Sequence, residues 1–117
     1  MVWIANLGAL ITLFLGCVGL LFPKRIGRTL GIRPIGALGV SELRATYGGF
    51  FLCLGAGCLA TQSQQVFLLA GAAWCGAALA RLLSFVIDKS HSRENVIGFI
   101  VESTIGLMKL SAIFNIS

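Results

Sequence analysis

The chain contains few charged residues. Of its 117 residues, 11% are Asp, Glu, Lys or Arg and 57% are apolar, whereas a soluble domain carries about 25% charged residues. So few charges cannot cover a surface that faces water, which excludes a soluble globular protein and, with it, a soluble enzyme. The apolar content also excludes a disordered chain and a collagen-like repeat. We therefore expect a membrane protein with a single domain, residues 1–117.

Histidine and cysteine are too few or too scattered to build a chemical site. His91, the one histidine of the sequence, stands in the polar segment DKSHSREN. The four cysteines, Cys17, Cys53, Cys58 and Cys75, stand in apolar stretches without a C-x-x-C spacing. Zinc sites and nucleophilic triads need several such side chains close together. We therefore expect no catalytic residue, no metal and no cofactor, and we interpret the cysteines as buried free thiols.

Long apolar stretches are what the sequence has in abundance. A transmembrane helix needs about 20 predominantly apolar residues, and we predict helices at about residues 2–22, 42–60, 66–87 and 96–114. No basic segment precedes the first stretch, so we expect a retained helix and not a cleaved signal peptide. Short connections between such helices favour an all-α, four-transmembrane-helix antiparallel bundle.

Lysine and arginine gather on one side of the predicted membrane. Seven of the nine basic residues lie in the first connection, at the start of the second helix or in the third connection, and the second connection, TQSQQ, has none. The positive-inside rule makes that side cytoplasmic and puts both termini outside. We expect Lys24, Arg25, Arg28 and Arg33 to contact anionic lipid head groups. Nucleic acid is not an expected partner, because a basic groove interleaved with aromatic residues is missing.

The first connection is also rich in glycine. We predict that it forms a short interfacial helix, with Ile26 and Leu30 entering the head-group boundary. Ser41 is the expected N-cap of the second transmembrane helix, and Glu42 would then lie in its first turn.

Small residues recur at a spacing of four in each apolar stretch. Helices in membranes associate where small side chains let their backbones approach, so these positions predict packing faces. The four faces are Gly8, Thr12 and Gly16; Ala45, Gly49, Cys53 and Gly57; Ala72, Gly76, Ala80 and Ser84; and Gly98, Glu102 and Gly106. The last face contains a glutamate, which indicates that a charged group lies inside the bundle.

Ionisable residues inside the predicted helices form the candidate site, because such residues are costly in a membrane and usually face the interior. Arg81 and Glu102 lie at equal depth, about 9–10 Å from the cytoplasmic ends of consecutive helices, and are expected partners. We expect Lys109, near the other side, to extend toward the interface. The predicted polar cluster consists of Glu42, Arg44, Tyr47, Arg81, Asp88 and Glu102. Its ion pairs either fix the helix register or form the floor of a cavity for a polar head group, a quinone-like ring or a proton.

The sequence resembles a family of small bacterial membrane proteins. The run LLFPKRIGRTLGIRPIGALGVSELRATYGGFFLCLG (residues 20–55), the segment GAALARLLSFVID (76–88) and the late glutamate of the fourth helix are similar to the family described as domain of unknown function 4345. The resemblance covers nearly the whole chain and is most specific at SELRATYGG and at the arginine of ARLLS. It implies a four-helix protein of the bacterial inner membrane, distantly similar to DoxX-like proteins, and it supplies no activity. The residues that match the family pattern are Glu42, Arg44, Tyr47, Gly48, Gly49, Arg81 and Glu102.

Two functions stay open for this non-enzymatic membrane protein. It is either an accessory subunit that packs against a larger inner-membrane complex or a second copy of itself, or a stand-alone binding protein or small transporter. In the second case Arg81 and Glu102 would bind a lipid-like or quinone-like molecule. A membrane oxidoreductase or isomerase activity rests on the DoxX-like similarity alone.

Overall fold

The computed structural model describes residues 2–114, and all regular structure in this part of the chain is helical. Four segments are long and apolar enough to cross a membrane, as in a multi-pass membrane protein. They are α1, the continuous run α3–η1–α4, α5, and α6 with η2. The elements are α1 (Val2–Leu21), α2 (Pro23–Leu30), α3 (Gly36–Arg44), the π-helix η1 (Ala45–Phe50), α4 (Phe51–Thr61), α5 (Gln64–Ile87), α6 (Arg93–Leu110) and the 3₁₀ turn η2 (Ser111–Ile113).

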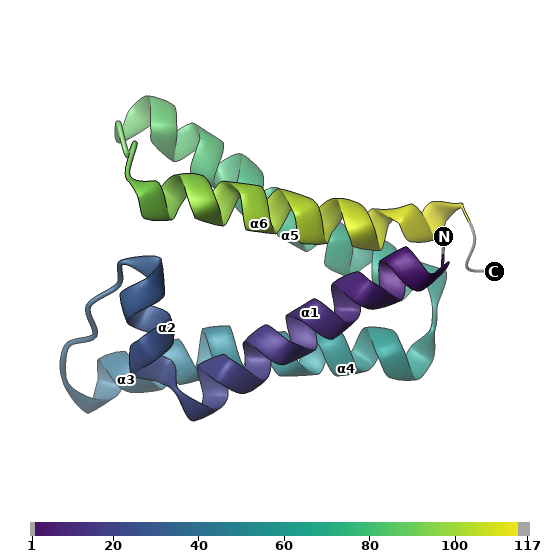
Figure 1. Ribbon diagram of the computed structural model, residues 1–117, viewed down its shortest axis with the longest axis horizontal. Helices are drawn as coiled ribbons and strands as arrows, with labels where there is room; N and C mark the ends of the chain where they lie inside the picture. The colour runs from purple at the N-terminus through teal and green to yellow at the C-terminus, as the bar shows by residue number, and fades with distance from the viewer. Residues whose placement is uncertain (1, 115–117) are drawn as a thin grey trace.

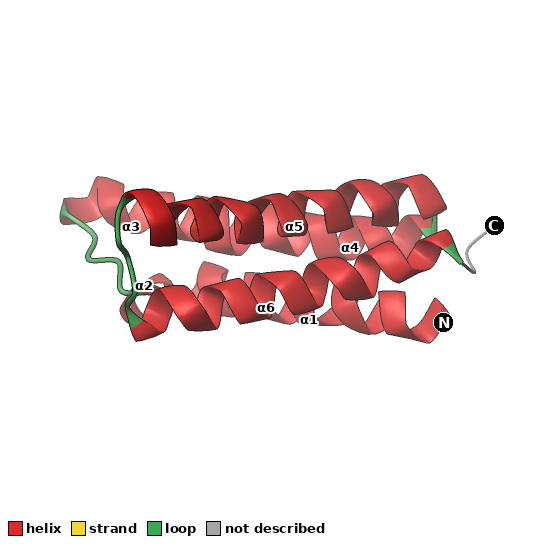
Figure 2. Cartoon of the chain, turned by 90° about the horizontal axis from the view of Figure 1, so that it is seen from above, coloured by secondary structure: helices red, strands yellow, loops and turns green. Residues whose placement is uncertain are grey.

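The long helices form two packed pairs. The first helix pair consists of α1 against η1 and α4, and the second consists of α5 against α6. Figure 1 shows that the two pairs approach each other at the end where α1 begins and lie apart at the other end, where α2 stands between them. Seen from above, the long helices follow the longest axis of the molecule (Figure 2). The space between the pairs therefore widens toward the end that carries α2 and α3.

The first helix pair packs backbone against backbone. A Cβ added to Gly19 of α1 would lie 2.0 Å from the carbonyl oxygen of Tyr47, and one added to Gly16 would lie 2.4 Å from the nitrogen of Leu52. The predicted face of α1 is buried as expected. The predicted face of the second transmembrane helix is wrong, because Gly48, and not Gly49, lies against α1. Spacing alone cannot choose between two consecutive glycines.

The second transmembrane helix begins six residues earlier than predicted. It starts at Gly36, so Ser41 and Glu42 lie inside α3, and Ser41 is not the N-cap. The physical reason is Pro34, which is poorly accommodated in a helix interior and sets the boundary. Ile35 after it is extended and is the N-cap, and residues 36–40, GALGV, form the first turns of the helix.

The predicted small-residue face of α5 is also wrong. Ala72, Gly76 and Ala80 are exposed, whereas Phe67 and Trp74 are buried. The core near the termini consists of Ala5, Ala9, Cys58, Phe67, Ala70 and Ala112. The buried face of α5 therefore combines Phe67 and Trp74 with the small residues Ala70, Gly71 and Ala78, and it is a different face from the one predicted.

The cysteines are free thiols, but only part of the set is buried. Cys58 is buried and Cys75 is half-buried, whereas Cys17 and Cys53 are exposed on the outside of the first helix pair. In a membrane such positions face lipid, where a thiol acts as a small apolar group.

Lys109 lies inside the fold, and the prediction that it extends toward the interface is wrong. Its side chain is 0% exposed. Its ammonium donates a hydrogen bond to Thr12 Oγ1 of α1 and lies 5.1 Å from the centre of the Trp74 ring. Gly8, one turn before Thr12, leaves space for the lysine stem, since a Cβ there would lie 3.4 Å from Lys109 Cγ. Lys109 therefore joins α6 to α1 where the two helix pairs meet.

Candidate functional site

Arg81 and Glu102, expected as partners from their equal depth, form an ion pair between α5 and α6. Arg81 Nε lies 2.5 Å from Glu102 Oε1, and the two side chains are 25% and 15% exposed. Arg81 Nη1 also donates to Asn95 Oδ1 at 3.0 Å, and Asn95 Nδ2 donates to the carbonyl oxygen of Ser90 at 2.9 Å. The arginine is therefore held from two sides by α6, through one charged and one neutral acceptor.

Gly98 makes room for this arrangement. Asn95, Gly98 and Glu102 are spaced three and four residues apart, so they share one face of α6. A Cβ added to Gly98 would lie 2.5 Å from Arg81 Cζ, which means that the guanidinium rests on the glycine backbone. The side chain of Ser92 accepts a hydrogen bond from the backbone nitrogen of Asn95 and starts α6 at a register that presents this face to Arg81.

The ion pair borders a cavity between the two helix pairs. Its volume is about 160 Å³, and its lining is mostly apolar. Both helix pairs and α2 contribute: Leu15, Ile26, Thr29, Leu30, Tyr47, Phe51, Trp74, Arg81, Glu94, Ile97, Gly98, Val101 and Glu102. Ile26 and Leu30 of α2 thus line this cavity, which differs from the prediction that they enter the head-group boundary. A concave, mostly apolar site with a few polar groups is the usual form of a small-molecule site.

Trp74 supplies an unused hydrogen-bond donor beside the cavity. The side chain is 5% exposed, and its ring packs on Phe51 with the two ring centres 4.8 Å apart. Its indole nitrogen has no hydrogen-bond partner among residues 2–114. A buried N–H without an acceptor costs about 1–3 kcal/mol, so an acceptor brought by a ligand would remove a penalty that the fold otherwise carries.

The structure brings only part of the predicted polar cluster together. Tyr47 lines the cavity with Arg81 and Glu102. Glu42 is exposed and lines a separate hollow. Arg44 is exposed and donates a hydrogen bond to the carbonyl oxygen of Leu20, one of the carbonyls at the end of α1 that lack a helical partner.

Asp88 also lies outside the cavity. It is exposed, and its Oδ2 accepts a hydrogen bond from Ser84 Oγ at 2.5 Å, one turn earlier. Metal ligation has no set of side chains to support it, because no group of three His, Cys, Asp or Glu residues within residues 2–114 could hold an ion.

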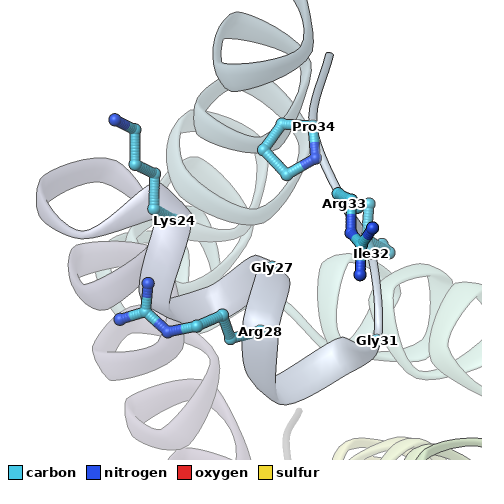
Figure 3. A pocket seen from close by; sticks show the side chains of 7 residues that line it. All are labelled: Lys24, Gly27, Arg28, Gly31, Ile32, Arg33 and Pro34. Atoms are coloured by element: carbon cyan, nitrogen blue, oxygen red, sulfur yellow. The ribbon is translucent and has the colours of Figure 1, made fainter. Parts of the chain in front are cut away.

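The basic residues of the first connection surround a hollow on the outside of the molecule. Lys24 and Arg28 come from α2 and Arg33 from the segment after it (Figure 3). The volume of this hollow is about 410 Å³. Arg25 is turned to Phe22, with its guanidinium carbon 5.7 Å from the ring centre.

Sequence reasoning missed Trp74, which lines the cavity, and Asn95, which binds Arg81, although a spacing argument could have found both. Trp74 stands seven residues before Arg81, and Asn95 stands seven before Glu102, so each shares a helix face with a residue that was chosen. Gly98 was chosen for packing between helices and not for its contact with a guanidinium. Lys109, seven residues after Glu102, follows the same rule and is buried.

Comparison with known proteins identifies the family and adds no activity. No curated protein matches the chain, and no solved structure matches it. The family described as Domain of unknown function (DUF4345) matches residues 1–112. Because this match covers nearly all of the sequence, the chain belongs to the DUF4345 family.

Proposed function

We propose that this protein binds a lipid-like or quinone-like molecule in the cavity between its two helix pairs. The observation that carries the proposal is the unpartnered indole N–H of Trp74, buried in the wall of an apolar cavity that also holds Arg81 and Glu102. An amphiphile with an oxygen acceptor fits both features, since its apolar part fills the cavity and its oxygen accepts from a buried donor.

The position of the ion pair argues against a purely structural role. Arg81 and Glu102 both belong to the second helix pair, whose helices already pack together along their lengths. A side-chain hydrogen bond that does join the two helix pairs is the one from Lys109 to Thr12, near the other end of α6. A structural ion pair would be most useful across the widening space between the pairs, and this one does not cross it.

The membrane setting belongs to the same proposal. We place the protein in the bacterial inner membrane as an antiparallel four-helix bundle, with the basic end in the cytoplasm and both termini outside. The support for this orientation is the charge distribution, because seven of the nine basic residues lie in the first and third connections or in the helix segments beside them.

Fluorescence of Trp74 tests the binding proposal. The sequence has two tryptophans, so the Trp3→Phe variant leaves Trp74 as the sole reporter. Decylubiquinone, a short-chain quinone that quenches indole emission on contact, should quench it saturably in a maltoside detergent. Glu102→Gln should weaken this binding at least about tenfold, because a neutral amide holds the guanidinium less firmly than a carboxylate does. The free energy of unfolding should fall by less than about 1 kcal/mol, since the pair is partly exposed.

Two further variants separate charge from geometry. Gly98→Ala should weaken quenching without altering any charge, because its Cβ would displace Arg81 Cζ. Asp88→Asn removes one negative charge outside the cavity and should bind as wild type. Linear, unsaturable quenching would contradict the proposal. If Glu102→Gln binds the quinone as wild type does but loses much of its stability, the ion pair has only a structural role.

A second candidate function has its own supporting observation. Ala72, Gly76 and Ala80 form an exposed stripe on α5, and a Cβ added to Gly76 would meet nothing within 4 Å. Such a stripe suits close approach of another transmembrane helix, as expected of an accessory subunit. Native extraction in mild detergent followed by mass spectrometry decides: migration with a larger complex favours the subunit, and a lone small species contradicts it.

A further inference from the structure

Two hollows lie side by side on the outer surface around α2. The first is the one described above, with Lys24, Arg28 and Arg33 in its lining. The second contains Lys24 and Arg28 again, now with Arg25 and Arg44. Each hollow has a volume of about 410 Å³. Because the two share Lys24 and Arg28, they form one basic surface with two adjoining depressions, which we call the paired basic hollow.

The turn after α2 brings the basic residues together. Gly31 has a left-handed backbone with φ of 76°, and the Ile32 nitrogen donates to the carbonyl oxygen of Gly27 at 2.8 Å. This is a Schellman-type ending, which reverses the chain direction. Gly27 is buried, and a Cβ there would lie 2.9 Å from the Ile32 carbonyl oxygen. The returning segment therefore passes over Gly27 and places Arg33 beside α2.

No cation of the paired basic hollow forms an ion pair with a carboxylate of the described residues, although the side chain of Glu94 lies beside Gly31 at the edge of the first depression. Neither depression has an Asp or Glu in its lining. Among residues 2–114, the one ion pair with an N–O distance of 4.0 Å or less is Arg81 with Glu102, which borders the inner cavity and lines neither depression. Five cations that repel one another are stabilised by external anions, and arginine is suited to phosphate because its planar fork donates two parallel hydrogen bonds.

The surroundings indicate that the anion belongs to a lipid. The first apolar span ends at Leu21, three residues before Lys24, so the hollow lies at head-group depth. A third, mostly apolar hollow of about 540 Å³ adjoins the first and shares Arg33 with it. Ile35 and Leu38 in its lining are 88% and 74% exposed. Glu42 is the carboxylate at this apolar hollow. An acyl chain fits the apolar hollow while a phosphate occupies the basic one.

We infer that the paired basic hollow is a binding site for a phospholipid whose head group carries two phosphates, one for each depression. Lys24 and Arg28 lie between the phosphates and contact both, whereas Arg33 serves one phosphate and Arg25 and Arg44 serve the other. Two linked phosphates bind more tightly than two separate lipids, because the second contact is intramolecular. The site lies on the outer side of α2, whereas Ile26 and Leu30 of the same helix line the inner cavity, so it does not depend on the proposed function.

Native mass spectrometry of the full chain, freed of lipid in dodecyl maltoside, tests this inference. The probes are tetraoleoyl cardiolipin, dioleoylphosphatidylglycerol at twice the molar concentration, dioleoylphosphatidylcholine and inorganic phosphate. We expect one cardiolipin per chain, bound at least about tenfold more tightly than phosphatidylglycerol. Inorganic phosphate at equal phosphate concentration should not displace it.

A matched pair of variants separates a defined site from general attraction. Arg28→Gln should weaken cardiolipin binding more than about twentyfold, because Arg28 lines both depressions and loses charge-assisted hydrogen bonds. Arg93→Gln removes the same charge from the first residue of α6, outside both depressions, and should weaken binding by no more than about fivefold. Arg33→Gln, in the segment outside any helix, is a second test of the site if Arg28→Gln does not fold. Arg28→Gln should leave quinone quenching of Trp74 unchanged.

Several outcomes overturn the inference. Equal losses of cardiolipin affinity in Arg28→Gln and Arg93→Gln would show general attraction to the positive charge at this end of the molecule and not a defined site. Binding of phosphatidylcholine as tightly as cardiolipin would remove the role of charge. If two phosphatidylglycerol molecules bind as tightly as one cardiolipin, the two phosphates need not be linked in one lipid. Displacement of the lipid by inorganic phosphate would assign the site to the free anion.

Discussion

The contact between α1 and η1 makes stability depend steeply on one methyl group. Gly19→Ala introduces a Cβ that would lie 2.0 Å from the Tyr47 carbonyl oxygen and 2.9 Å from the Gly48 nitrogen. An ordinary carbon–oxygen contact is about 3.3–3.6 Å, so the two backbones would have to separate by more than 1 Å at this point. Both clashing atoms belong to the backbone, and no side chain can rotate away to absorb the overlap.

The loss of stability expected for Gly19→Ala depends on the other close contacts between α1 and the second transmembrane helix. Gly16 approaches the Leu52 nitrogen and Gly48 approaches Leu20 in the same interface. Moving the two backbones apart at Gly19 would therefore also weaken these contacts. Overpacking of this kind costs about 1–3 kcal/mol, and backbone contact places Gly19→Ala at the upper end. Alanine recovers at most about 1 kcal/mol through its helix propensity. We expect a net loss of about 2 kcal/mol in the free energy of unfolding.

Reversible unfolding in mixed micelles, with increasing dodecyl sulfate and circular dichroism as the readout, measures this loss. Gly57→Ala is the control, because a Cβ there meets nothing within 4 Å, and it should match or exceed wild type. The difference between the two variants should be about 2–3 kcal/mol. A Gly19→Ala protein within about 0.5 kcal/mol of Gly57→Ala would refute the reasoning, since the backbones could not then be in contact.

Two shorter predictions concern Lys109 and the topology. Lys109→Met should leave the free energy of unfolding unchanged or raise it by up to about 2 kcal/mol in the same assay. The reason is that the buried ammonium has a hydroxyl, and not a carboxylate, as its partner. A loss above about 2 kcal/mol would contradict this expectation. Ser63→Cys, made in a chain whose native cysteines are replaced by alanine, should react in intact cells with a membrane-impermeant maleimide. Labelling only after permeabilisation would reverse the orientation that we propose.

The positions of the membrane-spanning helices could be predicted from the sequence because hydrophobic length is a local property. The start of the second helix was the exception. Ser41 and Glu42 match a helix N-terminus in residue type, but the helix already starts at Gly36. The face on which each helix packs is not a local property of the sequence. In the second transmembrane helix, for example, it depends on whether Gly48 or Gly49 lies against α1. That choice required the structure.

The candidate site was predictable to the extent that it depends on depth and helix face. Their equal depth in the membrane predicted that Arg81 and Glu102 are partners, and the structure contains this ion pair. Arg44 could not be assigned in this way, because its partner is the backbone carbonyl of Leu20, 24 residues away along the chain. Asp88 is held by its own helix. The partner of Asp88 is the Ser84 side chain, so of these two residues only Arg44 depends on a backbone partner that the sequence does not display.

The chemistry of the cavity also distinguishes between the two ligand classes. Arg81 and Glu102 together carry no net charge and Glu94 adds a negative one to the lining, so an anionic ligand would bring an uncompensated charge into a mostly apolar space. Of the five N–H donors of Arg81, two have acceptors in Glu102 and Asn95, and the Trp74 donor has none among the described residues. The cavity therefore offers donors and requires a neutral acceptor. A quinone carbonyl meets this requirement, whereas a phosphate or a fatty-acid carboxylate is better matched by the unpaired cations around α2.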